Sequence, residues 1–302
     1  MATGVGVECR RSRSRARRPG RGRLGDNAPM RLVDSHAHLN ADRFGDDVEA
    51  VLDRAQAAGV ERILVPGWNV ASSGRALEVA VVRPWLDAAV GVHPHDAAKV
   101  SPADWAAVEG WARDDRVVAI GETGLDSDRM FSPWEAQLDN LRRNLALALA
   151  TGKPAILHCR SRTGARDAQD ALVAELRAAG FDGPAARVAF GERPAAVIHS
   201  FSGPVDYARE VIAMGLAVSF SGLVFRRGEE PSAEAVAMVP AARFLVETDA
   251  PFLSPPGAPR SRNDPAFVAI TARWAAGPRR VGEAALGDAL VAVYDATFRD
   301  RA

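Results

Sequence analysis

All six histidines of the 302-residue chain lie at the ends of short apolar runs, and two of them stand two positions apart in "VDSHAHLN". In an extended strand, residues i and i+2 point to the same side. His36 and His38 can therefore direct both imidazoles at one point, as a metal site requires. Two polar residues in a loop would give the same pattern, and one His-x-His triplet is a weak signal.

Other residues that can bind metals or move protons occur at equivalent places in the sequence. Each lies at the end of an apolar run: His93, His95, Glu122, His158, His199 and Asp249. Singly, such a histidine can be a buried residue bonded to the backbone, and such a carboxylate a helix cap or an ion-pair partner. Together they indicate a metal site, because no histidine lies elsewhere. Even four of these imidazoles with the two carboxylates exceed the ligands of one tetrahedral zinc ion, and they suit two divalent ions that share a carboxylate.

Eight short runs rich in apolar and β-branched residues are candidate strands, and they lie near residues 32, 63, 90, 119, 156, 197, 218 and 245. Such continuous apolarity is typical of strands buried on both faces, as in a parallel sheet. Four segments between them have helical spacing or helix start and stop signals. They are 46–59, ending at Gly59; 101–114, opened by Ser101 and Pro102; 132–152, opened by Ser132 and Pro133; and 203–215.

The alternation of these elements predicts an α/β fold, a (β/α)8 TIM barrel, as a single domain over residues 30–302. The C-terminal ends of barrel strands meet on one face, so the polar residues at the run ends would come together there. An open doubly wound sheet is the alternative. It is disfavoured because no Gly-x-Gly-x-x-Gly sequence follows the first run.

Residues 1–29 differ in composition from the rest of the chain. They hold eight arginines against two acidic residues, so we expect a disordered, Arg-rich basic tail. A twin-arginine export signal would need an apolar stretch after the arginines, and "PGRGRLGDNAP" follows instead. The tail could be an arm that tethers nucleic acid, or an extension upstream of a true start at Met30. The remaining residues carry net negative charge and do not form a basic nucleic-acid binder by bulk charge.

The composition also bears on where the protein acts. No apolar run approaches the roughly 20 residues of a membrane span. Two cysteines, Cys9 and Cys159, are too few for a disulfide framework. We therefore expect a cytoplasmic protein with no membrane partner, and we favour a monomer.

Seven stretches of the chain resemble, in order, the motifs of the TatD-type metal-dependent deoxyribonucleases, members of the amidohydrolase-like barrel superfamily. They are "DSHAHLN", "GVHPHDA", "AIGETGLD", "ILHCRS", "IHSFSG", "ETDAPFLSP" and "RNDPAFV", spread over residues 31–270. The resemblance implies a barrel with two divalent cations and hydrolysis of DNA phosphodiester bonds, often as a 3′ exonuclease on single strands. Mg²⁺, Mn²⁺ and Zn²⁺ all accept such a mixture of histidine and carboxylate ligands.

The resemblance also implies roles for individual residues. It places His36, His38 and Asp249 on one ion, His158 and His199 on the second, and Glu122 between the two. Asp249 would also take the proton of the attacking water. His93 would contact the substrate phosphate, whereas His95 is as readily structural. Arg160 faces the same way as His158 and could clamp a phosphate or form a surface ion pair, and Arg262 and Asn263 would order the loop after the last strand.

Some segments depart from the family pattern and leave the substrate open. The family commonly has tyrosines after "ETGLD", where this chain has Ser127, and only Phe131 or Trp134 could offer a stacking surface. The helix that follows has Gln137, Leu141 and Asn144 where the family usually has glutamine and phenylalanine. Residues 180–194 look like a loop extension that could shape the rim of the site.

Two other functions compete with the nuclease. The first is hydrolysis of an amide or ester bond in a small molecule or an aminoacyl-tRNA. Many amide-cleaving relatives bridge their metals with a modified lysine at the fourth strand, where this chain has Glu122. The second is non-catalytic nucleic-acid binding through the arginine tail, which retention of all six potential ligands disfavours.

Overall fold

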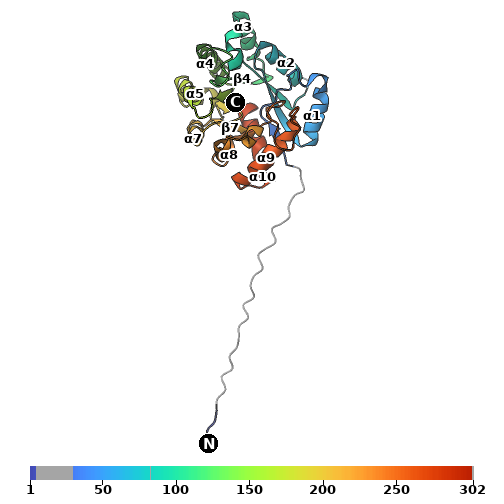
Figure 1. Cartoon of the computed structure of the whole chain (residues 1–302), viewed down its shortest axis with the longest axis vertical. Coiled ribbons are helices and arrows are strands. Elements are labelled where there is room, and N and C mark those ends of the chain that lie inside the picture. Colours follow the sequence, from blue (N-terminus) through green and yellow to red (C-terminus); the bar gives the residue numbers. More distant parts are fainter. Residues whose placement is uncertain (5–29, 82, 301–302) are drawn as a thin grey trace.

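Eight parallel strands form the centre of the protein. The computed structural model describes residues 1–4, 30–81 and 83–300, so most of the predicted tail lies outside the described residues. Neighbouring strands in the sheet follow the order of the chain. They are β1 (Leu32–Asp34), β2 (Val60–Pro66), β3 (Leu86–Val90), β4 (Val117–Asp126), β5 (Ala155–Arg160), β6 (Ala196–Ile198), β7 (Ala217–Phe220) and β8 (Phe244–Val246). Helices surround this ring (Figure 1), and the predicted (β/α)8 barrel is confirmed.

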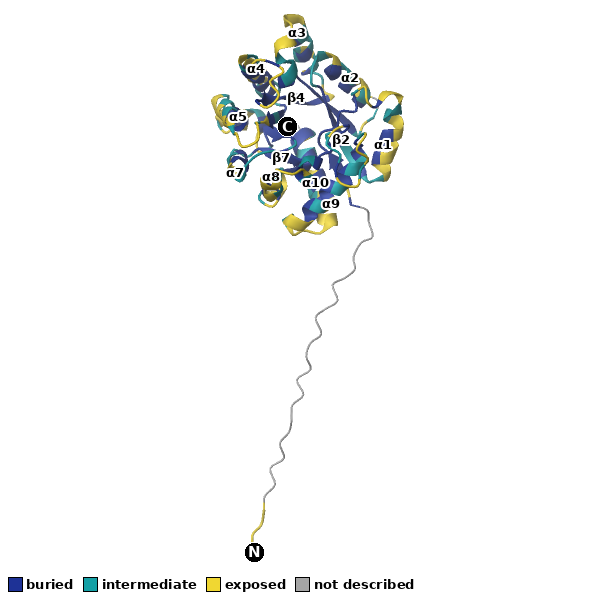
Figure 2. Ribbon diagram, viewed as in Figure 1, coloured by how far each residue is buried: buried dark blue, intermediate teal, exposed yellow. Residues whose placement is uncertain are grey.

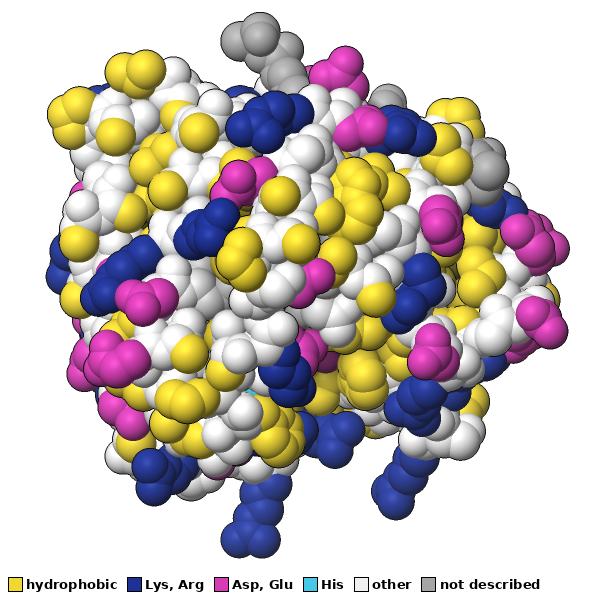
Figure 3. Space-filling model, turned by 90° about the horizontal axis from the view of Figure 1, so that it is seen from above, with side chains coloured by type: hydrophobic (Ala, Val, Ile, Leu, Met, Phe, Trp, Pro, Cys, Tyr) yellow, Lys and Arg dark blue, Asp and Glu magenta, His cyan; other side chains and the backbone are white. Residues whose placement is uncertain are grey.

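The helices bury one face against the strands and expose the other. They are α1 (Val48–Ala57), α2 (Val70–Val81), α3 (Pro102–Trp111), α4 (Trp134–Thr151), α5 (Asp167–Ala178), α6 (Pro184–Phe190), α7 (Val205–Ala213), α8 (Glu230–Ala235), α9 (Val268–Arg279) and α10 (Glu283–Phe298). Figure 2 shows the strands buried and the outer helix faces exposed. Figure 3 shows one side of the barrel, where basic and acidic side chains are interspersed. Among the described helices, none has the length and apolarity that crossing a membrane requires.

The ring closes where β8 meets β1, through hydrogen bonds just beyond the ends of these short strands. The amide of Asp249 donates to the carbonyl of His36 at 2.9 Å, and the amide of His38 donates to the carbonyl of Ala250 at 2.7 Å. Backbone ladders of this kind fix register between neighbouring strands. The seam therefore holds the first His-x-His pair against Asp249.

A buried carboxylate reinforces this seam. Asp34 accepts hydrogen bonds from the Thr248 amide at 2.9 Å, the Thr248 hydroxyl at 2.6 Å and the His36 amide at 3.3 Å. Burial raises the pKa of Asp34 well above its usual range, although the Thr248 hydrogen bonds lower it. Asp34 thus links the end of β8 to the residues that follow β1.

One of the two predicted serine caps is confirmed. At the start of α3, Ser101 forms a capping box with Asp104, as the sequence predicts. The prediction that Ser132 caps α4 is wrong, because that helix begins without a side-chain cap. The buried hydroxyl of Ser132 instead donates to the carbonyl of His95 at 3.0 Å. A serine hydroxyl can bond any backbone group in reach, and here it ties the loop after β4 to the segment after β3.

The expectation of a rim-forming loop at residues 180–194 is also wrong. The segment contains helix α6, which packs against α4. The Arg193 guanidinium donates to the carbonyl of Gly152 at 3.1 Å, close to the start of β5. The apolar residues Phe181 and Phe190 are buried there, which a solvent-exposed rim loop would not do. The segment therefore lies at the N-terminal end of the strands, away from His158.

We predict that Asp34→Ala lowers the free energy of unfolding by about 3 kcal/mol, because it leaves the Thr248 amide and hydroxyl buried without their acceptor. The matched control is Asp53→Ala on the exposed face of α1, which should change it by less than about 0.5 kcal/mol. Urea unfolding followed by circular dichroism measures both. Equal midpoints for the two variants would show that Asp34 does not hold the seam.

Candidate metal centre

The structure brings all six histidines and several carboxylates together at the C-terminal ends of the strands. His36 and His38 follow β1, His93 and His95 follow β3, His158 lies in β5, and His199 follows β6. Glu122 lies in β4, where the pairing with β5 shifts register between Ile120 and Thr123. The register shift lies directly at Glu122, and irregular pairing of this kind changes the direction of a side chain relative to a regular strand. The sequence prediction that the run ends meet on one face of the barrel is confirmed.

Glu122 is the centre of this arrangement, and its two oxygens face different histidines. Its Oε2 lies 3.3 Å from His36 Nε2 and 3.6 Å from His38 Nε2. Its Oε1 lies 2.9 Å from His199 Nε2, 3.3 Å from His158 Nδ1 and 3.3 Å from His93 Nε2. The residue is 3% exposed. One buried carboxylate thus divides the site into two halves.

Asp249 completes the half that faces Oε2 of Glu122. Its Oδ1 lies 3.3 Å from His38 Nε2 and 3.7 Å from His36 Nε2, and the two imidazole nitrogens are 3.1 Å apart. Ligand atoms about 2.1 Å from one ion lie about 3.0–3.4 Å apart in octahedral or tetrahedral geometry. The three side chains therefore have the donor atoms of a divalent-cation site, and two of their three separations lie in this range, while the third, 3.7 Å, is slightly longer.

The half that faces Oε1 has a similar donor set. Glu122, His158 and His199 form a second group whose ligand atoms all lie within 4.8 Å of one another. Neutral imidazole and carboxylate are ligands shared by Mn²⁺ and Zn²⁺, and carboxylate also suits Mg²⁺. The residues present in both halves thus fit divalent cations.

Two carboxylates lie behind the histidines, and one of them, Glu247, fixes which ring nitrogen of His199 faces Glu122. Glu247 Oε1 lies 3.1 Å from His199 Nδ1, so Nε2 of that ring is directed at the centre. Asp126 Oδ2 lies 3.4 Å from His158 Nε2 without a hydrogen bond between them, and Nδ1 of that ring lies 3.3 Å from Glu122 Oε1. A carboxylate that accepts the second N–H of a ligating histidine raises its basicity as a ligand. The sequence analysis did not single out Glu247 or Asp126. The sequence signal for both is their spacing: Glu247 lies two residues before Asp249, and Asp126 lies four residues after Glu122.

Charges of opposite sign lie next to one another in the centre. Burial raises the pKa of Glu122, but the imidazole of His199 and its neighbours hold it well below its usual range. Burial lowers the pKa of His199, but Glu122 and Glu247 raise it well above its usual range. Burial lowers the pKa of His93 to about 4, so that ring is neutral near pH 7. Glu122 is therefore a buried anion that neighbouring positive charge stabilises.

The remaining predicted residues occupy different places. His93 lies inside the centre, against Glu122, rather than at its rim. His95 Nε2 pairs with Asp126 Oδ2 at 2.7 Å, which gives it a structural partner. Arg160 Nε pairs with Asp128 Oδ2 at 2.9 Å, and both side chains are partly exposed.

The residues expected to order the loop after β8 do so. Asn263 Nδ2 donates to the carbonyls of Thr248 at 2.9 Å and Phe252 at 2.7 Å. Arg262 pairs with Asp47, in the segment before α1. This loop carries Asp249 at its start, so both residues support the site without facing it.

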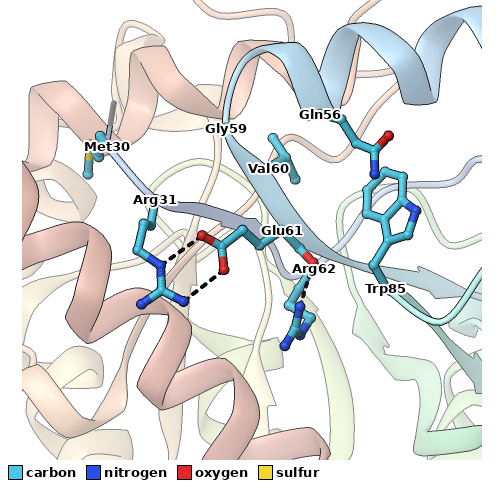
Figure 4. A pocket seen from close by; sticks show the side chains of 8 residues that line it. All are labelled: Met30, Arg31, Gln56, Gly59, Val60, Glu61, Arg62 and Trp85. Atoms are coloured by element: carbon cyan, nitrogen blue, oxygen red, sulfur yellow. Dashed lines mark hydrogen bonds and ion pairs between the residues drawn. The ribbon is translucent and has the colours of Figure 1, made fainter. Parts of the chain in front are cut away.

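A cavity of about 390 Å³ lies at the opposite end of the barrel. Its walls come from the residues just before β1 and at the start of β2, and it contains no histidine (Figure 4). Its one carboxylate, Glu61, accepts two hydrogen bonds from Arg31, at 2.7 and 2.8 Å. The cavity therefore has no imidazole, and its one carboxylate is already paired with a guanidinium.

Comparisons with known proteins agree with this geometry. A family model described as TatD related DNase matches residues 33–299. The chain is 36% identical over 242 residues to the uncharacterized metal-dependent hydrolase YabD of Bacillus subtilis, covering 80% of this chain and 88% of that protein. It is 36% identical over 253 residues to the 3′-5′ ssDNA/RNA exonuclease TatD of Klebsiella pneumoniae, covering 80% and 90%. The crystal structure of YJJV, a TatD homolog from Escherichia coli, matches with a TM-score of 0.78 and 29% identity, covering 91% of this chain and 100% of the other.

We predict that Glu247→Gln weakens the binding of Mn²⁺ or Zn²⁺ about 10- to 100-fold, because the His199 ring loses its charged partner. Competition with a chromogenic chelator measures the affinity without reference to activity. Glu78→Gln, an exposed change on α2, is the control and should bind as the unchanged protein does. Equal affinities for the two variants would contradict the role given to Glu247.

Proposed function

Because the chain belongs to the TatD-related DNase family and is thus a metal-dependent hydrolase, we propose that it uses two divalent cations to remove nucleotides from the 3′ ends of single-stranded DNA. The observation that carries the proposal is the position of Glu122, whose two oxygens face two separate groups of ligands. A carboxylate in this position can bridge two cations. In sites of this kind the ions lie about 3.5–4 Å apart.

The proposed ligands follow from the two halves of the centre. His36, His38 and Asp249 would hold one cation, His158 and His199 the other, with Glu122 shared. Bound there, divalent cations would lower the pKa of a water molecule and offset the charge that develops on the phosphate. Mg²⁺, Mn²⁺ and Zn²⁺ all remain candidates for both positions.

Asp249 is the residue best placed to accept the proton of the attacking water. Its side chain is 14% exposed, against 4% for Glu122, 1% for Asp126 and 0% for Glu247. It is thus the carboxylate of the centre that solvent and substrate reach most readily. A general base has to lie within hydrogen-bonding distance of the proton that it removes. The other three carboxylates face histidines on the inner side of the site.

Two side chains would position the phosphate. His93 Nε2 lies beside the half of the centre that contains His158, and the ring is neutral near pH 7. Arg160 is half exposed and bonds Asp128 through Nε. A guanidinium has five N–H donors, so it can contact a phosphate oxygen while it keeps that pair. We propose both as substrate contacts.

The burial of the centre favours a thin substrate. His36 is 0% and Glu122 3% exposed, so only a chain end or an unpaired strand can bring a phosphate to them. The Klebsiella relative is named a 3′-5′ ssDNA/RNA exonuclease, and RNA is therefore a second substrate to test. The cytoplasmic location and the monomeric state stay predictions.

Amide or ester hydrolysis remains the second candidate, and the position of the lysines disfavours it. Lys153 donates to the carbonyls of Ala112 and Asp114, both at 2.7 Å, near the start of β5. Lys99 is exposed and pairs with Asp96. Neither can take the bridging place that Glu122 holds.

We predict that the full chain releases nucleotides from 3′-labelled single-stranded DNA in Mg²⁺, Mn²⁺ or Zn²⁺, and that a chelator abolishes the release. Glu122→Ala and Asp249→Ala should each lower kcat about 10³-fold or more, since one removes the bridge and the other the base. Gel analysis of 3′- and 5′-labelled strands gives both rate and polarity. Glu78→Ala is the control.

Absence of cleavage by the folded, cation-loaded protein in all three metals would overturn the nuclease assignment. Ester and aminoacyl-tRNA substrates would then be tested with the same variants.

A further inference from the structure

Two exposed aromatic rings flank the metal centre. Among the aromatic residues of the described ranges, only Phe131 and Phe252 are exposed, at 62% and 46%. The Phe252 ring centroid lies 6.0 Å from that of His38, and the Phe131 centroid lies 4.7 Å from that of His95. Single exposed apolar side chains are common on protein surfaces. Here both exposed aromatic rings touch histidines of the same site.

The two rings lie on opposite halves of the centre. Phe252 contacts His38, which belongs to the half that faces Oε2 of Glu122. Phe131 contacts His95, whose ring lies 4.3 Å from that of His93, in the half that faces Oε1. A phosphodiester bound between the halves carries one nucleoside on each side. Each phenylalanine is therefore placed beside one of the two nucleosides that flank the scissile phosphate.

Buried polar side chains hold the backbone of Phe131 in place. Gln137 is 0% exposed and donates to the carbonyl of Ser132 at 3.0 Å and to that of Asp126 at 3.1 Å. The Ser132 hydroxyl in turn donates to the carbonyl of His95. The loop between β4 and α4 is thus anchored on both sides of the exposed ring. An aromatic side chain on a fixed backbone loses little conformational entropy when it binds a ligand.

The backbone of Phe252 is anchored in a similar way. Its amide donates to the carbonyl of Asp249 at 2.8 Å, and its carbonyl accepts from Asn263 Nδ2 at 2.7 Å. The Arg43 guanidinium lies 5.8 Å from the ring centroid. Nucleobases stack on aromatic faces and on arginine, and this contact does not depend on base identity. The chemistry of the rim therefore suits an unpaired nucleobase next to a phosphate.

We infer that Phe131 and Phe252 form a pair of base-stacking subsites, one for each nucleoside that flanks the scissile phosphodiester. The inference rests on the proposed nuclease function and adds to it the contact that selects unpaired ends. A base held in a duplex is stacked on its neighbours and cannot lie against either ring. The pair thus accounts for a preference for single strands without sequence specificity.

The test combines a substitution in the protein with the removal of one base from the substrate and compares the effects on KM. Phe131→Ala and Phe252→Ala are assayed on 3′-labelled single strands that carry a tetrahydrofuran abasic residue at the terminal position, the penultimate position or neither. Each substitution should lose its effect on KM when the base at one of these two positions, the coupled position, is absent. On intact DNA, each variant should raise KM about 5- to 150-fold, the ratio that corresponds to stacking energies of about 1–3 kcal/mol.

At the coupled position, removal of the ring and removal of the base together should raise KM no more than either change alone. Phe131→Trp should restore the KM of intact DNA. Val188→Ala, an exposed apolar residue on α6 at the other end of the barrel, is the control for loss of an exposed side chain. Its KM should equal that of the unchanged protein on all three strands.

Two results would overturn the inference while the nuclease assignment stands: unchanged KM in both phenylalanine variants, or effects that persist in full on the abasic strands. The second would indicate that the rings support the fold or contact another molecule. If the unchanged protein cuts none of the strands, the nuclease assignment itself fails, and the stacking inference fails with it.

Discussion

The structure depends on a buried carboxylate, Glu122, whose two oxygens are contacted by histidines from different strands. A buried ionised group is costly unless charges of opposite sign surround it. Imidazole rings supply part of that compensation, and burial keeps the ring of His93 neutral near pH 7. Divalent cations would supply it more completely. The same feature that makes the site costly to bury would thus favour cation binding there.

Local interactions at the ends of the barrel strands bring the residues that surround Glu122 together. The pairing of β4 with β5 shifts register at Glu122, and the seam between β8 and β1 holds His36 against the backbone of Asp249. Glu247 then orients His199, and Asp126 pairs with His95. Residues far apart in sequence reach one point because parallel strands end on the same face. In the proposed complex, the exposed rings at the rim would contact the bases next to the phosphate.

Much of this arrangement could be predicted from the sequence, because apolar strand runs ending in histidine carry both the fold and the site. Glu247 and Asp126 were missed because a carboxylate behind a ligand has the same local pattern as an ion-pair residue. The sequence predicts that Ser132 caps a helix, but its hydroxyl has several equivalent backbone partners, and only tertiary structure selects one of them. The sequence predicts residues 180–194 at the rim of the site, which is wrong, because the length of a loop does not reveal the end of the barrel to which it belongs.

The most direct test of the central role of Glu122 is anomalous diffraction from crystals of the full chain loaded with Mn²⁺. The account predicts two peaks about 3.5–4 Å apart, one on each side of the Glu122 carboxylate. One peak should contact His36, His38 and Asp249, and the other His158 and His199. A single peak at saturating Mn²⁺, or two peaks that do not share Glu122, would contradict the account.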